Sequence, residues 1–89
     1  MSSSEVWYPR AVPGLEWRQA EGAFVASRPG DARVHALNST GVMLLELANG
    51  RHSVDEMTTI LQQAFGLDHP PANEVTQFLE HARRNGLVQ

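Results

Sequence analysis

Three short stretches with the spacing of β-strands come first in the chain. Residues 15–19 alternate between apolar and polar side chains with a period of two, which predicts a half-buried strand. After a turn at 20–22, a second strand is predicted at 23–26. A Pro-Gly-Asp turn at 29–31 then leads to a third strand at 33–37. Strands that follow one another through such short turns form a small antiparallel sheet.

From residue 38 onward the apolar positions recur with the spacing of helices. Asn38 is a favourable N-cap for a first helix, and Gly50 is expected to end that helix in the left-handed conformation. Ser53 and Glu56 have the spacing of a capping box, which predicts the start of a second helix. The apolar spacing of this second helix continues to Gly66.

A third helix is predicted before the Asn-Gly pair at 85–86. Its apolar positions are Val75, Phe78, Leu79 and Ala82. Leu87 and Val88 follow, and we expect them to fold back onto the core. The predicted fold is therefore α+β, a three-stranded antiparallel sheet followed by three helices.

The first fourteen residues have a different character. Pro9, Pro13 and Gly14 are incompatible with a helix there, so residues 1–14 are predicted to be an irregular arm ahead of a domain at 15–89. Trp7 and Tyr8 lie in this arm, and aromatic side chains are costly to leave in water. They either staple the arm to the domain or mark a contact surface.

Composition fits one small globular domain. The chain has 89 residues, 42% of them hydrophobic, and no cysteine. The lack of cysteine excludes a disulfide scaffold, a thiol nucleophile and a cysteine-ligated metal. The longest apolar run, at 42–45, is far shorter than the roughly 20 residues of a membrane span. Residues 1–5 lack the features of a signal peptide. We therefore expect a cytoplasmic protein with no membrane partner.

The sequence offers little to catalysis or metal binding. The four histidines, His35, His52, His69 and His81, include no pair at the i, i+4 spacing that shares a metal on one helix face. Motifs for phosphate loops, dinucleotide binding and nucleophile elbows are also missing. We therefore expect no catalytic residue, no metal and no cofactor, and hence no enzyme activity.

A family resemblance becomes visible at the junction between sheet and helices. The segment Leu-Asn-Ser-Thr-Gly at 37–41 is followed by Ala-Asn-Gly at 48–50 and Ser-Val-Asp-Glu at 53–56. Later come Glu-Val-Thr-Gln-Phe-Leu at 74–79 and Asn-Gly-Leu-Val at 85–88. In this order and spacing the segments resemble the PqqD-like family, the peptide-recognition domains of systems that modify ribosomally made peptides.

The resemblance extends over residues 13–88 and implies both a fold and a function. The family fold is a winged helix-turn-helix of three strands and three helices. Its members are not enzymes. They bind the leader segment of a precursor peptide and present that peptide to a modifying enzyme such as a radical SAM protein, a cyclase or a protease. The resemblance thus implies a stand-alone leader-peptide-binding adaptor.

The resemblance also implies where the peptide binds. The leader is added as a strand beside the third strand and against the third helix. The implied contact residues are Val34, His35, Ala36, Leu37, Val75, Phe78, Leu79, Ala82 and Arg83. Within this set we expect Phe78 to belong mainly to the core, and Leu79 and Arg83 to face the peptide.

A winged-helix protein that binds nucleic acid is the alternative. The third helix begins near Glu74, whose charge would repel phosphates, and its basic residues Arg83 and Arg84 lie at the far end. Reader helices usually place their contacts near the N-terminal end. The net charge of −3 also argues against a general polyanion binder. We therefore expect no nucleic-acid partner.

Overall fold

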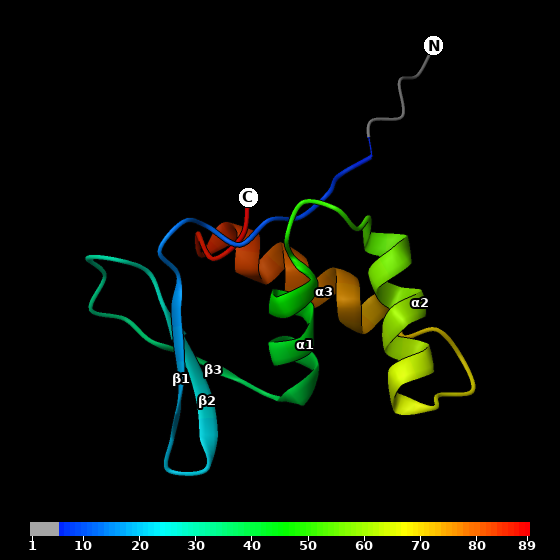
Figure 1. The fold of residues 1–89 in the computed structure, drawn as a ribbon, viewed down its shortest axis with the longest axis horizontal. Helices are drawn as coiled ribbons and strands as arrows, with labels where there is room; N and C mark the ends of the chain where they lie inside the picture. The colour runs from blue at the N-terminus through cyan, green and yellow to red at the C-terminus, as the bar shows by residue number, and fades with distance from the viewer. Residues whose placement is uncertain (1–5) are drawn as a thin grey trace.

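The computed structural model describes residues 6–89, which fold into three strands and three helices (Figure 1). The elements are β1 (Glu16–Ala20), β2 (Ala23–Ser27), β3 (His35–Leu37), α1 (Ser39–Leu47), α2 (Val54–Phe65) and α3 (Ala72–Arg84). The predicted order and fold class are confirmed. A winged helix-turn-helix is compatible with this arrangement. No helix within residues 6–89 is both long and apolar enough to cross a membrane.

The sheet is antiparallel, with strand order β1-β2-β3. A two-residue loop joins β1 to β2, and both its residues have positive φ, 52° at Glu21 and 81° at Gly22. This is the type I′ turn, whose twist matches that of the strands. The loop closes on the pair Ala20 and Ala23 and so fixes the register of the hairpin.

Capping side chains set the starts of the first two helices as predicted. The Asn38 side chain accepts a hydrogen bond from the Gly41 N–H at 2.8 Å. Ser53 and Glu56 form a complete capping box, with donor–acceptor distances of 3.1 and 2.8 Å. Gly66, with a φ of 62°, ends α2 in the left-handed conformation.

A single core lies between the sheet and the helices. Its buried hydrophobic residues are Ala26, Leu37, Leu44, Leu45, Ala48, Met57, Leu61, Val75, Leu79, Ala82, Leu87 and Val88. Leu87 and Val88 are only 1% and 2% exposed, so the predicted return of the C-terminus onto the core is confirmed.

The N-terminal arm pairs with the C-terminus and with the end of α1. Arg10 and Gln89 exchange two backbone hydrogen bonds, of 3.0 and 2.7 Å. On its other side the arm bonds to the α1–α2 connection, where the Ala11 N–H donates to Ala48 O at 2.8 Å. Pro9 is fully buried. The arm is therefore an ordered part of the body from Pro9 onward.

Two predicted boundaries are wrong. The third strand is predicted to start at residue 33 but begins at His35, because the Asp31 carboxylate accepts a hydrogen bond from the Arg33 N–H and holds a turn there. The first helix ends at Leu47, before the predicted Gly50. Gly50 has the expected left-handed φ of 81°, but its N–H donates to Pro9 O. The arm thus forms hydrogen bonds with backbone groups that a longer α1 would have used for its own hydrogen bonds.

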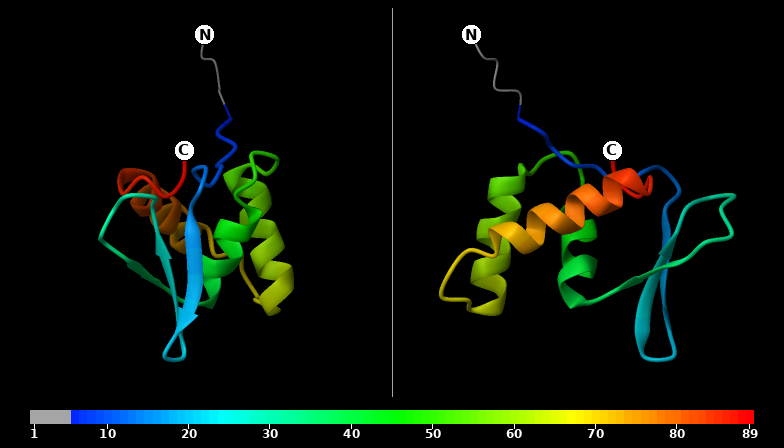
Figure 2. Two further views of the ribbon diagram at one scale, coloured as in Figure 1. Left: turned by 60° about the vertical axis from the view of Figure 1, so that its left-hand side comes forward. Right: turned by 180° about the vertical axis from the view of Figure 1, so that it is seen from behind.

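The half-buried alternation predicted for the first strand is also not observed. Trp17 of β1 is 37% exposed, and Phe24 of β2, near the far end of the hairpin, is 39% exposed. The β1–β2 hairpin extends beyond the helices, so its far half has little to pack against (Figures 1 and 2).

Candidate functional site

β3 has one free edge. It is hydrogen-bonded to β2, and β2 is also bonded to β1, so within residues 6–89 the other side of β3 is not paired with a strand. The type I′ hairpin makes Ala20 and Ala23 a hydrogen-bonded pair, which sets the alternation across the sheet. By that alternation the hydrogen-bonded pairs between β2 and β3 are Phe24 with Leu37 and Ala26 with His35. The N–H and C=O of Ala36, which lies between them, therefore point to the free edge.

Two close approaches at glycines place α3 near the segments that flank β3. At Gly41, just after β3, an added Cβ atom would be 2.8 Å from the Phe78 ring. At Gly86, just after α3, it would be 2.8 Å from the guanidinium of Arg28, which precedes β3. β3 and the second half of α3 therefore run in opposite directions side by side (Figure 2). The positions three and seven residues after Phe78, which lie along this side, are His81 and Asn85.

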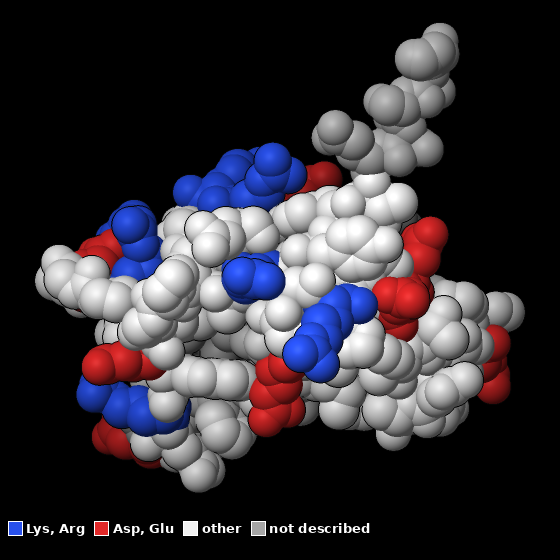
Figure 3. Space-filling model, turned by 45° about the horizontal axis from the view of Figure 1, so that its top comes forward, with Lys and Arg blue, Asp and Glu red and all other residues white. Residues whose placement is uncertain are grey.

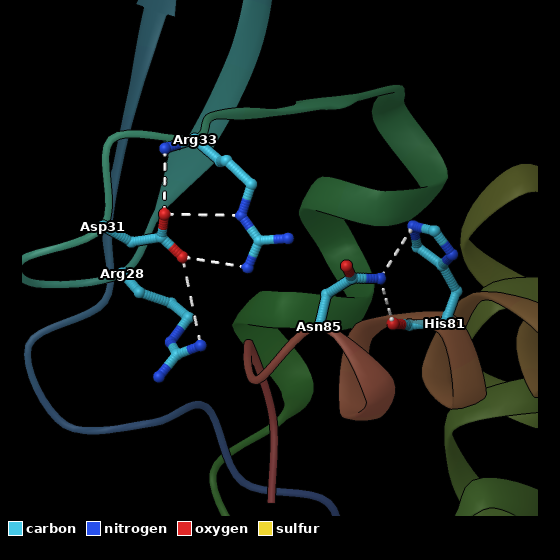
Figure 4. Close-up of polar contacts among 5 residues, drawn as sticks. All are labelled: Arg28, Asp31, Arg33, His81 and Asn85. Carbon is cyan, nitrogen blue, oxygen red and sulfur yellow. Dashed lines mark hydrogen bonds and ion pairs between the residues drawn. The ribbon is translucent and has the colours of Figure 1, made fainter.

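The β2–β3 loop, residues 28–34, carries an ionic cluster near the end of α3 (Figure 4). Asp31 accepts hydrogen bonds from Nε and Nη2 of Arg33 at 3.3 and 3.0 Å, and Nη1 of Arg28 lies 3.9 Å away. These hydrogen bonds from Arg33 lower the pKa of Asp31 from 3.8 to about 2. Asp31 therefore stays ionised and fixes the Arg33 side chain, which is 63% exposed.

Asn85, the C-cap of α3, contacts His81 in the last turn of that helix (Figure 4). The side-chain nitrogen of Asn85 lies 2.8 Å from the backbone oxygen of His81 and 3.2 Å from its Nε2. An amide nitrogen can only donate, so this contact is a hydrogen bond in the tautomer of His81 that has its proton on Nδ1 and accepts at Nε2.

The side chains of β3 and the residue before it alternate between the two faces of the sheet. Leu37 is buried and His35 half-buried on the face that carries the core residue Ala26. Val34 and Ala36 belong to the outer face, and Val34 is 55% exposed beside Val25 in a depression of about 400 Å³. Nε2 of His35 is buried and has no hydrogen-bond partner within residues 6–89.

The predicted helix-side residues divide into three environments. Val75, Leu79 and Ala82 are 0% exposed and belong to the core, whereas Phe78 is half-buried at its packed contact with Gly41. The expectation that Leu79 faces a peptide is therefore wrong, because the helix presents Leu79 to the core, whereas Phe78 packs against the core as expected. Arg83 is exposed, but it stacks on the Trp7 ring with 4.9 Å to the centroid.

Sequence reasoning missed His81 and Asn85. Their spacing from Phe78, three and seven residues, is the signal that could have found them, because these positions share one helix face. Within residues 6–89, no three side chains of the metal-ligating kinds gather into a cluster. The backbone edge of β3 can form hydrogen bonds with an extended chain, and the β2–β3 loop offers charged side chains at one end of this strand.

The stapling function considered for the arm aromatics applies to Trp7. It packs against the core cluster, and its Nε1 donates to Gln89 O at 3.3 Å. Tyr8 is 48% exposed.

Comparison with known proteins places the chain in a family. A family model described as coenzyme PQQ synthesis protein D (PqqD) matches residues 24–88, from β2 to the C-terminal tail. No curated protein and no solved structure matches the chain. The family match covers β2 from its second residue onward, all of β3 and the three helices, which form the candidate site. The chain belongs to the PqqD family.

Proposed function

We propose that this protein is an adaptor that binds the leader segment of a ribosomally made precursor peptide and presents the peptide to a separate modifying enzyme. Membership of the PqqD family supports an accessory role in the biosynthesis of PQQ or of related peptide-derived products. The observation that carries the finer proposal is the free edge of β3 at Ala36, with α3 alongside.

Strand addition is the binding mode that this edge favours. An unpaired strand edge offers regularly spaced N–H and C=O groups, which give affinity to an extended peptide of almost any sequence. Specificity comes from the side chains beside the edge. Here one side of an added strand would meet Phe78, His81 and Asn85 of α3, which differ in polarity.

The modifying chemistry belongs to the partner enzyme. A radical SAM protein, a cyclase or a protease would act on the core segment while the adaptor holds the leader. No cofactor is required for strand addition, because the contacts are hydrogen bonds and apolar packing.

The test is a titration with a synthetic peptide that covers the leader of the short reading frame nearest to this gene. We expect saturable binding with a Kd between micromolar and nanomolar, about −8 to −12 kcal/mol. Amide NMR shifts should cluster on residues 34–37 and on the Phe78 side of α3. Ala36→Pro should abolish binding, because proline has no N–H to donate to the added strand.

Gln19→Pro is the matched control. Gln19 of β1 pairs with Phe24 of β2. By the same alternation, the N–H of Gln19 points to the free edge of β1, on the opposite side of the sheet. This variant should bind the peptide as the parent protein does. Unchanged affinity in a folded Ala36→Pro variant would contradict strand addition at β3. Salt-dependent DNA binding that is lost in Arg84→Gln would favour the nucleic-acid alternative instead.

A further inference from the structure

We propose that the peptide is also recognised on the outer face of the sheet, where one of its apolar side chains, β-branched or aromatic, packs against Val34. This inference rests on the proposed function and adds a specificity-determining contact on the side of the added strand that is turned away from the core. The observations that carry it are the exposure of Val34 and its position beside the free edge of β3.

The side chain of Val34 lies on the outer face. The pairing register places Arg18, Val25 and Ala36 in one row across this face, and residues two positions apart along a strand share a face. The depression of about 400 Å³ agrees with this placement, because Val34 and Val25 both line it. Val34 is 55% exposed, so its methyl groups border an open hollow and are accessible to another side chain.

An added strand would pair with β3 from Ala36 toward Val34. By the alternation across the sheet, the backbone groups of these two residues point to the free edge. In the other direction the pairing stops, because Asn38 is the N-cap of α1 and its backbone oxygen already accepts from the Val42 N–H at 3.0 Å. The edge available to a peptide therefore consists of Val34 and Ala36.

The pleat of the sheet decides where the side chains of the peptide point. Paired strands share one pleat, so the peptide residues beside Val34 and Ala36 turn their side chains to the outer face, whichever way the peptide runs. Ala36 offers a single methyl group to such a neighbour, whereas Val34 offers a β-branched side chain. Cross-strand pairs of β-branched and aromatic residues are the favourable ones. One outward position of the peptide should therefore be selective and the other tolerant.

Charge offers little selectivity on this side of the molecule. The depression is lined by both Glu16 and Arg18, and the adjoining loop pairs Arg33 with Asp31 at 3.0 Å. In Figure 3, basic and acidic side chains likewise lie next to one another on the left, over the sheet and the β2–β3 loop. Opposite charges this close largely cancel for an approaching peptide. An apolar contact therefore distinguishes one peptide from another better than charge does here.

The experiment is selection from an mRNA-display library of random 12-residue peptides, with the parent protein, Val34→Ala and Val25→Ala as baits. We expect the parent protein and Val25→Ala to enrich peptides that share a β-branched or aromatic residue at one aligned position. Val34→Ala should lose the preference at that position. Val25 is the matched control, because it lies on the same face but one strand further from the peptide. An amide NMR spectrum of each bait checks that it is folded.

A double variant, Val34→Ala with Ala36→Val, tests the register of the contact. It moves the branched side chain two residues along the same edge and keeps both backbone N–H groups. The preferred apolar position should therefore move by two residues relative to the rest of the aligned peptides. A preference that stays at its original position would overturn the inference.

The complex with one enriched peptide then tests the contact directly. NOEs should join the Val34 methyl groups to the selected side chain, whereas NOEs from that side chain to the Phe78 ring instead would overturn the inference. Replacing the selected residue by alanine should raise the Kd of the parent protein about two- to fivefold, as expected for a cross-strand pair. The same peptide change should have little effect with Val34→Ala, because the partner is already gone.

The two proposals fail in different ways. If the parent protein enriches no peptide, the proposed function and this inference are both overturned. If it enriches peptides but every preference survives in Val34→Ala, only this inference is overturned.

Discussion

Phe78 of α3 lies so close to Gly41 of α1 that a single added carbon on Gly41 would be 2.8 Å from Cε1 and 3.3 Å from Cζ of the ring. Gly41 is buried and lies in the first turn of α1. The contact joins the helix that follows β3 to the helix that runs beside it. It therefore sets how closely α3 approaches the strand edge.

Gly41→Ala should destabilise the protein by about 1–3 kcal/mol, the usual cost of overpacking a core contact. The Phe78 ring must move to admit the new methyl group. Urea unfolding measures the change in free energy.

The Phe78→Leu background provides the control. With the ring removed, Gly41→Ala should become neutral or stabilise the fold by up to about 1 kcal/mol, because alanine is the better helix former. The same loss in both backgrounds would show that the ring contact is not its cause.

Asp31 should titrate near pH 2 in the folded protein, as followed by NMR of its carboxyl carbon. Because the pKa is lowered by folding, the loop contact contributes stability above the ordinary pKa of 3.8 and loses it as the pH falls toward 2. Loop order should therefore decline between about pH 4 and pH 2.

Arg33→Gln should bring the pKa of Asp31 back toward 3.8, since the hydrogen bonds from Arg33 are the main cause of the shift. Arg28→Gln should raise it less, because Arg28 acts only through its charge at 3.9 Å. Equal effects of the two substitutions would contradict this assignment.

His35→Leu should leave the stability of the free protein unchanged or raise it by up to about 1 kcal/mol. The substitution removes a buried Nε2 with no partner within residues 6–89, and such an atom carries a desolvation cost of about 1–3 kcal/mol. His69→Leu, at an exposed position, should shift the urea midpoint very little. A clear loss of stability in His35→Leu would mean that the imidazole is satisfied in solution.

Arg83→Gln should loosen the arm around Trp7, because the stacked guanidinium contributes about 0.5–1 kcal/mol at an exposed site. In a Trp17→Phe background, Trp7 fluorescence reports this contact alone, and its emission should move to longer wavelength. Arg84→Gln removes the neighbouring charge and should leave the emission unchanged. Equal shifts of the Trp7 emission in Arg83→Gln and Arg84→Gln would contradict this prediction.

Local signals were enough to predict the element order. The capping residues Asn38 and Ser53 act through hydrogen bonds to the next three residues, so their effect is contained in a few letters of sequence. Gly66 ends α2 for an equally local reason. These positions agree with prediction because nothing distant competes with them.

Errors arose where a distant segment supplies the partner. The end of α1 is set by hydrogen bonds from the arm, whose residues are some forty positions away in sequence. The burial of Leu79 and the orientation of His81 depend on the rotation of α3 about its axis, which packing against α1 and α2 decides. Helical spacing gives the members of each face but does not say which face meets the sheet.

The N-terminal arm and the C-terminal residue are paired side by side at Arg10 and Gln89. Arg10 and Gln89 are hydrogen-bonded to each other, so the arm at Arg10 and the chain at Gln89 lie on the same side of the body. An enzyme fused to this domain would therefore be attached on the same side of it, whether the enzyme precedes or follows the domain in the reading frame. In either order, such a fusion would attach the enzyme near the Arg10–Gln89 pair.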